Sequence, residues 1–236
     1  ILCCGEALID FLPREGKDGA AVYQPVNGGS VYNTAIALGR LGEDTGLFAG
    51  LSTDFFGDSL RAGLTESKVS LKFTRSKPQH TTLAFVKLEN GHARYSFVDD
   101  ASAGRNLVKA DLPKLPKAVA ALHFGSISLI PEPEGGTYEA LLKREAKSRV
   151  ISIDPNIRAS LIKDRKKHLA RLSRSLWIAF LVIPPLGVMT TFVAPGIGRP
   201  DELGSDADGV DELDRERVEW NGLVEGQGQG GRRLAE

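Results

Sequence analysis

The feature that most constrains the fold is an alternation of short apolar runs with segments of helical periodicity. The apolar runs are predicted to be strands and lie at residues 1–12, 22–26, 47–51, 118–123 and 150–153. The segments with helical spacing lie at residues 34–41, 56–67 and 137–147. Strands that alternate with helices form βαβ units, and these build a parallel sheet with helices on both faces. The sequence therefore predicts an α/β fold.

Residues 81–98, TTLAFVKLENGHARYSFV, break this alternation. They contain two β-rich runs on either side of Asn90-Gly91, a dipeptide that favours the tight turn of a β-hairpin. A hairpin does not belong to a βαβ unit. We therefore expect these two strands to lie outside the parallel sheet.

The composition is that of an ordinary globular protein, with 42% hydrophobic and 25% charged residues and a formal net charge of zero. Without a surplus of positive charge, we expect neither nucleic acid nor an anionic membrane as a partner. The only two cysteines, Cys3 and Cys4, are adjacent, which argues against a disulfide framework and is typical of a reducing compartment. The first residues lack a basic region and include Glu6 and Asp10, unlike a signal peptide. These features predict a cytoplasmic protein.

The character of the chain changes near residue 173. Lysine does not occur after Lys167, and residues 176–198 carry no charge. That stretch is long enough to cross a membrane, but Pro184-Pro185 interrupts it where a helix would be disrupted. We therefore predict no membrane span, with a protein tethered to a membrane by residues 176–198 as the alternative. Residues 199–236 are rich in glycine and acidic residues with little periodicity, which predicts a poorly ordered tail.

The stretch NGGSVYNTAIALGRLG, residues 27–42, has two interpretations. Gly28 and Gly29 let the backbone turn sharply and let a ligand approach without meeting a Cβ. Asn33 offers both a donor and an acceptor, which suits a sugar hydroxyl. Alternatively, the glycines only form a turn and Asn33 caps the following helix. Spacing alone does not decide between these two interpretations.

The segment DPNIR, residues 154–158, follows a predicted strand. Ligands of open parallel sheets gather at the carboxyl ends of the strands, so Asn156 and Arg158 are candidates to contact a phosphate or a polar substrate. The alternative is a structural Asp-Pro turn with an exposed arginine. Asp10, at the end of the first predicted strand, is likewise either a hydroxyl ligand or a cap.

Other chemistry-bearing residues give no recognisable site. The four histidines show no metal-ligand spacing, and Ser126 lacks the G-x-S-x-G context of a nucleophile elbow. The chain contains no Walker A sequence. The sequence therefore predicts no protein-held metal site.

Together these segments resemble the ribokinase/PfkB family of carbohydrate kinases, with the greatest similarity to bacterial fructokinases. The resemblance covers about residues 1–173 and is carried by GEALIDFLPRE (5–15), NGGSVYNTAIALGRLG (27–42), FAGLSTDFFGDSL (48–60), TTLAFVKLENGHARYSF (81–97), ASAGR (101–105), LHFGSISLI (122–130) and VISIDPNIR (150–158). It implies a ribokinase-like parallel sheet flanked by helices, with a small β lid built from residues near 10–26 and 81–98.

The resemblance also implies an activity and a site. The activity is phosphoryl transfer from ATP, with Mg²⁺, to a sugar hydroxyl, most closely D-fructose to fructose 6-phosphate; 2-keto-3-deoxygluconate kinase and ribokinase are the related alternatives. By position, the substrate-binding residues are Asp10, Gly28, Gly29, Asn33 and Arg105. Asn156 and Arg158 are implied to lie towards the phosphates. Homodimerisation through the β lid is the implied protein contact.

The departure from the family pattern is in the carboxyl-terminal part. The family's catalytic Gly-Ala-Gly-Asp segment, whose Asp takes the hydroxyl proton and whose amides stabilise the transferring phosphate, is absent. GIGRPD, residues 196–201, does not replace it because Pro200 stands where the helix amides are needed. We hypothesise that truncation or a frameshift replaced this part of the fold, so that residues 174–236 are unrelated sequence and the chain is inactive. The alternative is a non-catalytic sugar-binding or dimerising fragment.

Overall fold

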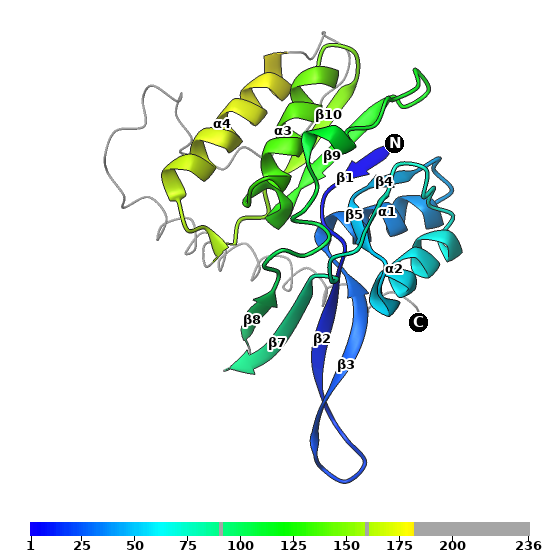
Figure 1. The fold of residues 1–236 in the computed structure, drawn as a ribbon, viewed down its shortest axis with the longest axis vertical. Helices are drawn as coiled ribbons and strands as arrows, with labels where there is room; N and C mark the ends of the chain where they lie inside the picture. The colour runs from blue at the N-terminus through cyan, green and yellow to red at the C-terminus, as the bar shows by residue number, and fades with distance from the viewer. Residues whose placement is uncertain (90–91, 159–160, 182–236) are drawn as a thin grey trace, which may run out of the picture. The chain divides into compact units, whose positions relative to one another are not determined.

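The computed structural model describes residues 1–89, 92–158 and 161–181. The elements follow in chain order as β1 (Leu2–Cys4), β2 (Leu8–Glu15), β3 (Ala21–Gly28), α1 (Ser30–Arg40), β4 (Gly46–Phe48), β5 (Gly50–Ser52), α2 (Phe55–Glu66), β6 (Arg75–Lys77), β7 (Leu83–Glu89), β8 (His92–Val98), the 3₁₀ turn η1 (Lys109–Asp111), β9 (Ala121–Gly125), the 3₁₀ turn η2 (Ser126–Leu129), α3 (Glu134–Glu145), β10 (Val150–Asp154) and α4 (Arg165–Leu181) (Figure 1).

The central sheet has the strand order β10-β9-β1-β4, and every neighbouring pair is parallel. The first strand of the chain lies inside the sheet, where Cys3 is opposite Leu47 of β4 and His123 of β9. This arrangement confirms the parallel sheet that the alternating pattern predicted. It also brings the carboxyl ends of all four strands to one edge.

The two faces of this sheet are covered by separate hydrophobic clusters. Because strand side chains alternate between faces, Leu2 and Cys4 pack into the cluster that includes Tyr138 of α3, whereas Cys3 packs into the cluster that includes Tyr32 of α1. Both cysteines are buried thiols. The architecture is therefore helix, sheet, helix, with α3 and α4 on one face and α1 and α2 on the other (Figure 1).

A second sheet forms the β lid, with the order β3-β2-β7-β8. β2 pairs antiparallel with β3 and parallel with β7, and β7 pairs antiparallel with β8. Figure 1 shows these four strands extending away from the helices and the central sheet. The predicted hairpin strands thus lie outside the parallel sheet as expected; the predicted turn at residues 90–91 lies outside the described residues.

Two predicted strands are each divided in the structure. Residues 1–12 form β1 and β2, separated at residues 5–7, because the chain leaves the central sheet there and enters the lid. A Cβ on Gly5 would overlap the Val31 side chain, so the close approach of α1 requires glycine. Residues 47–51 likewise form β4 and β5, which belong to different sheets. In consequence Asp10 lies within a lid strand rather than at the end of a central one.

The helix α4 continues across the predicted boundary at residue 173. Leu172 is buried in the α3-side cluster, and Ile178 packs against the same cluster. The family-like part of the chain therefore shares its last described helix with residues 174–181. Within the described residues, no helix is long and apolar enough to cross a membrane; of the uncharged stretch 176–198, residues 182–198 lie outside the described part.

Candidate functional site

The carboxyl ends of the central strands bring together residues that are far apart in the sequence. In the parallel pair of β9 and β10, Gly125 is opposite Asp154, so the residues that follow these strands are neighbours. The Asn156 side chain donates a hydrogen bond from Nδ2 to Ser126 Oγ at 3.4 Å. Sequence reasoning pointed to Asn156 but set Ser126 aside, because it had no catalytic motif around it.

Asp10 lies in β2 with its carboxyl group over the backbone of Gly28, the last residue of β3. A Cβ at position 28 would overlap Asp10 Oδ2. The Asp10 side chain is half-buried, and no hydrogen-bond donor in the described part of the chain contacts it. Burial accordingly raises the pKa of its carboxyl group. Asp10 and Gly28 thus form one unit, in which the glycine makes room for a carboxylate that has no partner among the described residues.

Gly29 and Glu6 lie at the N-terminus of α1, which begins at Ser30. Gly29 has φ 104°, in the left-handed region that favours glycine, and a Cβ there would lie 2.9 Å from the Glu6 carbonyl oxygen. Glu6 Oε1 accepts hydrogen bonds from the backbone N–H of Ser30 at 2.9 Å and of Val31 at 3.4 Å. A carboxylate from the loop after β1 therefore satisfies amides that a local cap residue usually meets. Burial raises the pKa of Glu6, and the hydrogen bond from the Val31 N–H acts in the opposite direction.

Asn33 does not cap the helix, so that alternative is wrong. It lies in the first turn of α1, where its backbone N–H donates to Gly29 O at 2.8 Å. Its side chain is exposed and has no hydrogen-bond partner among the described residues. An amide with a free donor and a free acceptor is available for a ligand hydroxyl.

Arg105 is held by an acidic partner where the lid returns to the core. Its Nε donates to Asp99 Oδ2 at 2.5 Å, and Asp99 Oδ1 also accepts from Thr82 Oγ1 at 2.7 Å and from Ser102 Oγ at 2.8 Å. These contacts orient the guanidinium group and partly neutralise it. The side chain is still 31% exposed.

Asn156 and Arg158 form a unit at the end of β10. Arg158 Nη1 donates to Asn156 Oδ1 at 2.5 Å, and the backbone N–H of Asn156 donates to Asp154 Oδ1 at 3.1 Å. Asn156 has a positive φ of 38°, which asparagine tolerates better than most residues. No acceptor in the described residues contacts Arg158 Nε or Nη2. Those donors are available for an anion.

A cavity of about 10 Å³ lies between the end of β1 and the return of the lid, and its lining includes Glu6, Thr82, Asp99 and Glu134. That volume is about the minimum for a single water molecule. Glu134 is 4% exposed and has no hydrogen-bond donor among the described residues. Burial, with the neighbouring Asp99 and Glu6 carboxylates, raises its pKa well above the usual value, and Arg105 only partly opposes this.

We expect Glu134→Gln to stabilise the protein at neutral and alkaline pH. The folded-state pKa of Glu134 lies above the unfolded value of about 4.5. The protein therefore has its full stability below pH 4.5 and loses stability as the pH rises towards the folded-state pKa, because the unfolded chain ionises first. Gln cannot ionise and therefore removes this cost, and the gain should be roughly 1–3 kcal/mol. Urea unfolding at pH 4 and pH 8 measures it. A destabilised E134Q at pH 8, with the surface control E43Q unchanged, would contradict this expectation.

The comparisons with known proteins decide the family. Residues 1–184 match the pfkB family carbohydrate kinases. The chain belongs to this family. Over 174 residues it is 55% identical to a fructokinase from Rhizobium leguminosarum bv. trifolii, an alignment that covers 74% of this chain and 53% of that protein. The pfkB match confirms the resemblance noted in the sequence.

Solved structures of sugar kinases have the same fold. A fructokinase from Xylella fastidiosa with bound ATP superposes with a TM-score of 0.69 at 28% identity, over 76% of this chain and 58% of that one. A fructokinase from Vibrio cholerae O395 in fructose, ADP and calcium ion bound form has a TM-score of 0.66 at 27% identity, over 75% of this chain and 57% of that one. These likenesses confirm the ribokinase-like α/β fold. The chain spans about half the length of the curated relatives that it matches.

Proposed function

We propose that this pfkB-family chain binds a sugar, with D-fructose as the first candidate, on the surface made by Asp10, the Gly28-Gly29 turn and Asn33. The observation that carries the proposal is the half-buried Asp10 carboxylate, which has no protein partner in the described residues and lies over a glycine that makes room for it. A buried polar group without a partner is costly. Neighbouring sugar hydroxyls can donate to its two oxygens and remove that cost.

The other predicted residues have complementary roles in this proposal. Asn33 offers a donor and an acceptor beside the turn. Arg105, which Asp99 orients, would select among hydroxyl patterns from the lid's return. The 55% identity to a fructokinase favours fructose; 2-keto-3-deoxygluconate and ribose are the competing sugars.

In a complete family member, the reaction is phosphoryl transfer from ATP to a sugar hydroxyl. Arg158 fits the phosphate side because its Nε and Nη2 have no described acceptor, and a guanidinium group pairs well with phosphate oxygens. Mg²⁺ would enter with ATP and neutralise phosphate charge. Among the described residues, no group of three or more His, Cys, Asp or Glu side chains is arranged to hold a metal ion, so we assign no metal ligand.

We propose that the 236-residue chain binds sugar but does not phosphorylate it. Its sequence contains no Gly-Ala-Gly-Asp segment, which in the family supplies the base for the hydroxyl and the helix-terminal amides for the transferring phosphate. Isothermal titration with D-fructose should show binding, and a coupled ADP-release assay should show no fructose-dependent turnover. Measurable turnover would overturn the inactivity, and absence of fructose binding would overturn the sugar site.

A dimerising fragment is the second candidate, supported by the exposed apolar side chains of the lid. Tyr23 and Tyr95 are 49% and 48% exposed, and Val22 and Val98 are 43% and 48% exposed. Strand side chains alternate between faces, so Tyr23 and Val98 lie on one face of the lid and Val22 and Tyr95 on the other. We propose that a second copy of the chain packs against one of these faces, and a monomeric mass in sedimentation equilibrium would contradict it. Two buried, free cysteines are consistent with the cytoplasmic location that we propose.

We explain the changed carboxyl-terminal part by a frameshift or a truncation. Reading the coding DNA beyond codon 173 tests this explanation.

A further inference from the structure

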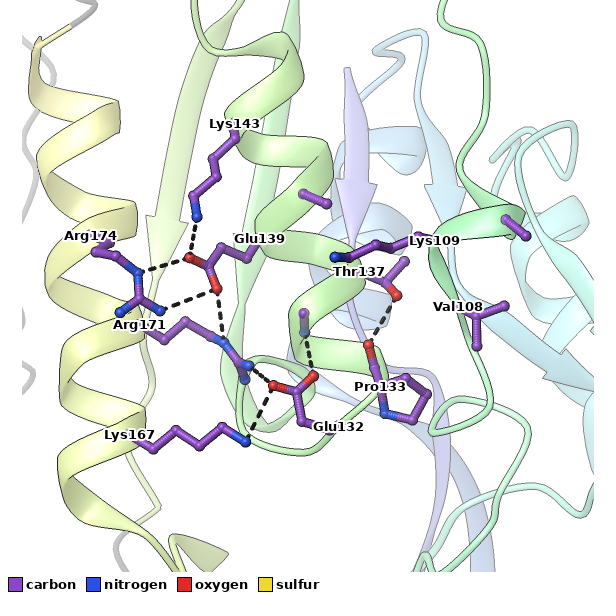
Figure 2. A pocket seen from close by; sticks show the side chains of 13 residues that line it. Val108, Lys109, Glu132, Pro133, Thr137, Glu139, Lys143, Lys167, Arg171 and Arg174 are labelled. Carbon is purple, nitrogen blue, oxygen red and sulfur yellow. Dashed lines mark hydrogen bonds and ion pairs between the residues drawn. The ribbon is translucent and has the colours of Figure 1, made fainter.

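A groove on the side of α3 lies outside the predicted sugar and phosphate site. It has a volume of about 670 Å³ and is bounded by η1, α3 and α4 (Figure 2). None of the residues predicted from the sequence to bind sugar or phosphate lines it. Its volume is within the range of small-molecule sites, roughly 300–1,000 Å³.

The charges that line this groove are mostly positive. The cations are Lys109, Lys143, Lys167, Arg171 and Arg174, and the carboxylates are Glu132 and Glu139. The Arg174 and Lys143 side chains lower the pKa of Glu139 to about 2 against its burial, so this carboxylate is ionised at neutral pH. Five cations against two carboxylates give the lining a formal surplus of three positive charges, although the whole chain has none.

Glu132 and Glu139 do not pair with every N–H group of the cations that line the groove. Arg171 is 5% exposed and has a partner at each of its three nitrogens, since it contacts Glu139, Glu132 and the carbonyl oxygens of Leu129 and Ile130. Lys143 and Arg174 are 49% and 47% exposed and share the single carboxylate of Glu139. Their remaining N–H groups are open to a ligand.

Lys109 is the least satisfied cation of the groove. It is exposed, and no ion pair or hydrogen bond joins its side chain to any residue of the described part. Figure 2 shows its ammonium group pointing from η1 toward α3, across from the cations of α4. An anion seated between η1 and α4 would therefore meet positive charge from both sides.

We propose that this groove binds a phosphorylated small molecule that carries at least two negative charges. Several donors that converge on a concave site match the multiple acceptor oxygens of a phosphate group. The chain as a whole is neutral, which does not suit the extended backbone of a nucleic acid. The site is separate from Arg158 and does not depend on the proposed sugar binding.

Titration calorimetry of the full 236-residue chain with inorganic pyrophosphate tests this proposal. The buffer contains a chelator and no Mg²⁺, and sodium chloride keeps the ionic strength constant. We expect saturable binding that becomes about tenfold weaker in Lys109→Gln, since a charge-assisted hydrogen bond contributes roughly 1.5 kcal/mol or more. The matched control is Lys117→Gln, which removes the same charge from an exposed position outside the groove. K117Q should bind like the unmodified chain, and R158Q is measured alongside it to detect anion binding at the strand ends.

Three outcomes would overturn the proposal. The first is a heat signal that does not saturate or that sodium chloride alone reproduces, which is an ionic-strength effect only. The second is equal weakening in K109Q and K117Q. The third is loss of binding in R158Q with K109Q unaffected, which would place the anion at the strand ends. Lys109 has no described partner, so K109Q should unfold at the same temperature as the unmodified chain, which excludes misfolding as the cause.

Discussion

The variants Asp10→Asn and Gly28→Ala should each weaken sugar binding by about 10- to 100-fold, because hydrogen bonds to a charged group contribute roughly 1.5–3 kcal/mol. D10N removes the carboxylate that is proposed to accept from sugar hydroxyls. G28A leaves that carboxylate in the chain but places a Cβ where Asp10 Oδ2 lies. The two changes should therefore damage the same contact by different routes.

A double-mutant cycle measured by fructose titration tests whether D10N and G28A act on the same contact. Because both substitutions act on one contact, the D10N/G28A variant should bind no more weakly than the worse single variant. Asp44→Asn is the matched control, since Asp44 is exposed. Additive losses in the cycle would show that Gly28 acts independently of Asp10. Normal fructose binding by D10N would place the sugar elsewhere.

The variant Glu139→Gln should lower the free energy of unfolding by roughly 3 kcal/mol at pH 7. Glu139 is 10% exposed and binds three cations: Lys143 Nζ at 2.7 Å, Arg174 Nε at 3.0 Å and Arg171 Nε at 3.3 Å. Breaking a buried ion pair costs about 3–5 kcal/mol because the remaining charge is left buried. We expect the lower end of that range, since Arg171 keeps Glu132 as a second partner.

The pH dependence of this loss follows from the pKa of Glu139. The folded value is about 2 and the unfolded value about 4.5, so the stability contribution is fully present above the unfolded value and is lost as the pH falls towards 2. Urea unfolding should show the difference between E139Q and the unmodified protein shrinking between pH 5 and pH 2. E43Q, at an exposed position, should change stability by less than about 0.5 kcal/mol. A constant E139Q difference across that range would rule out the ion-pair explanation.

Glu134 and Glu139 show why helix pattern alone does not predict such effects. Both are glutamates of α3 and both are buried. Glu139 faces three cations that come from α3 itself and from α4, whereas Glu134 faces Asp99 and Glu6 across the small cavity. The same substitution is therefore expected to destabilise at one position and to stabilise at the other.

Much of the fold could be predicted from local pattern. The alternation of strand and helix signals indicated the parallel sheet, and Asn90-Gly91 between β-rich runs indicated two lid strands. What local pattern missed was the division of residues 1–12 at Gly5. The apolar run continues through Ala7 and Leu8, so its periodicity contains no sign that the chain passes there from one sheet to another.

The sequence by itself determined the α/β class, the family resemblance, and the glycine and asparagine that mark the candidate sugar site. These are properties of neighbouring residues, where backbone propensity and side-chain period act within a few positions. Only the tertiary structure decided that Glu6, not Asn33, satisfies the first amides of α1, 24 residues further along the chain. It also decided that Arg171 meets Glu132 at a separation of 39 residues. Such contacts depend on how the elements pack around the sheet, and residue spacing along the chain does not encode that packing in a form that can be read directly.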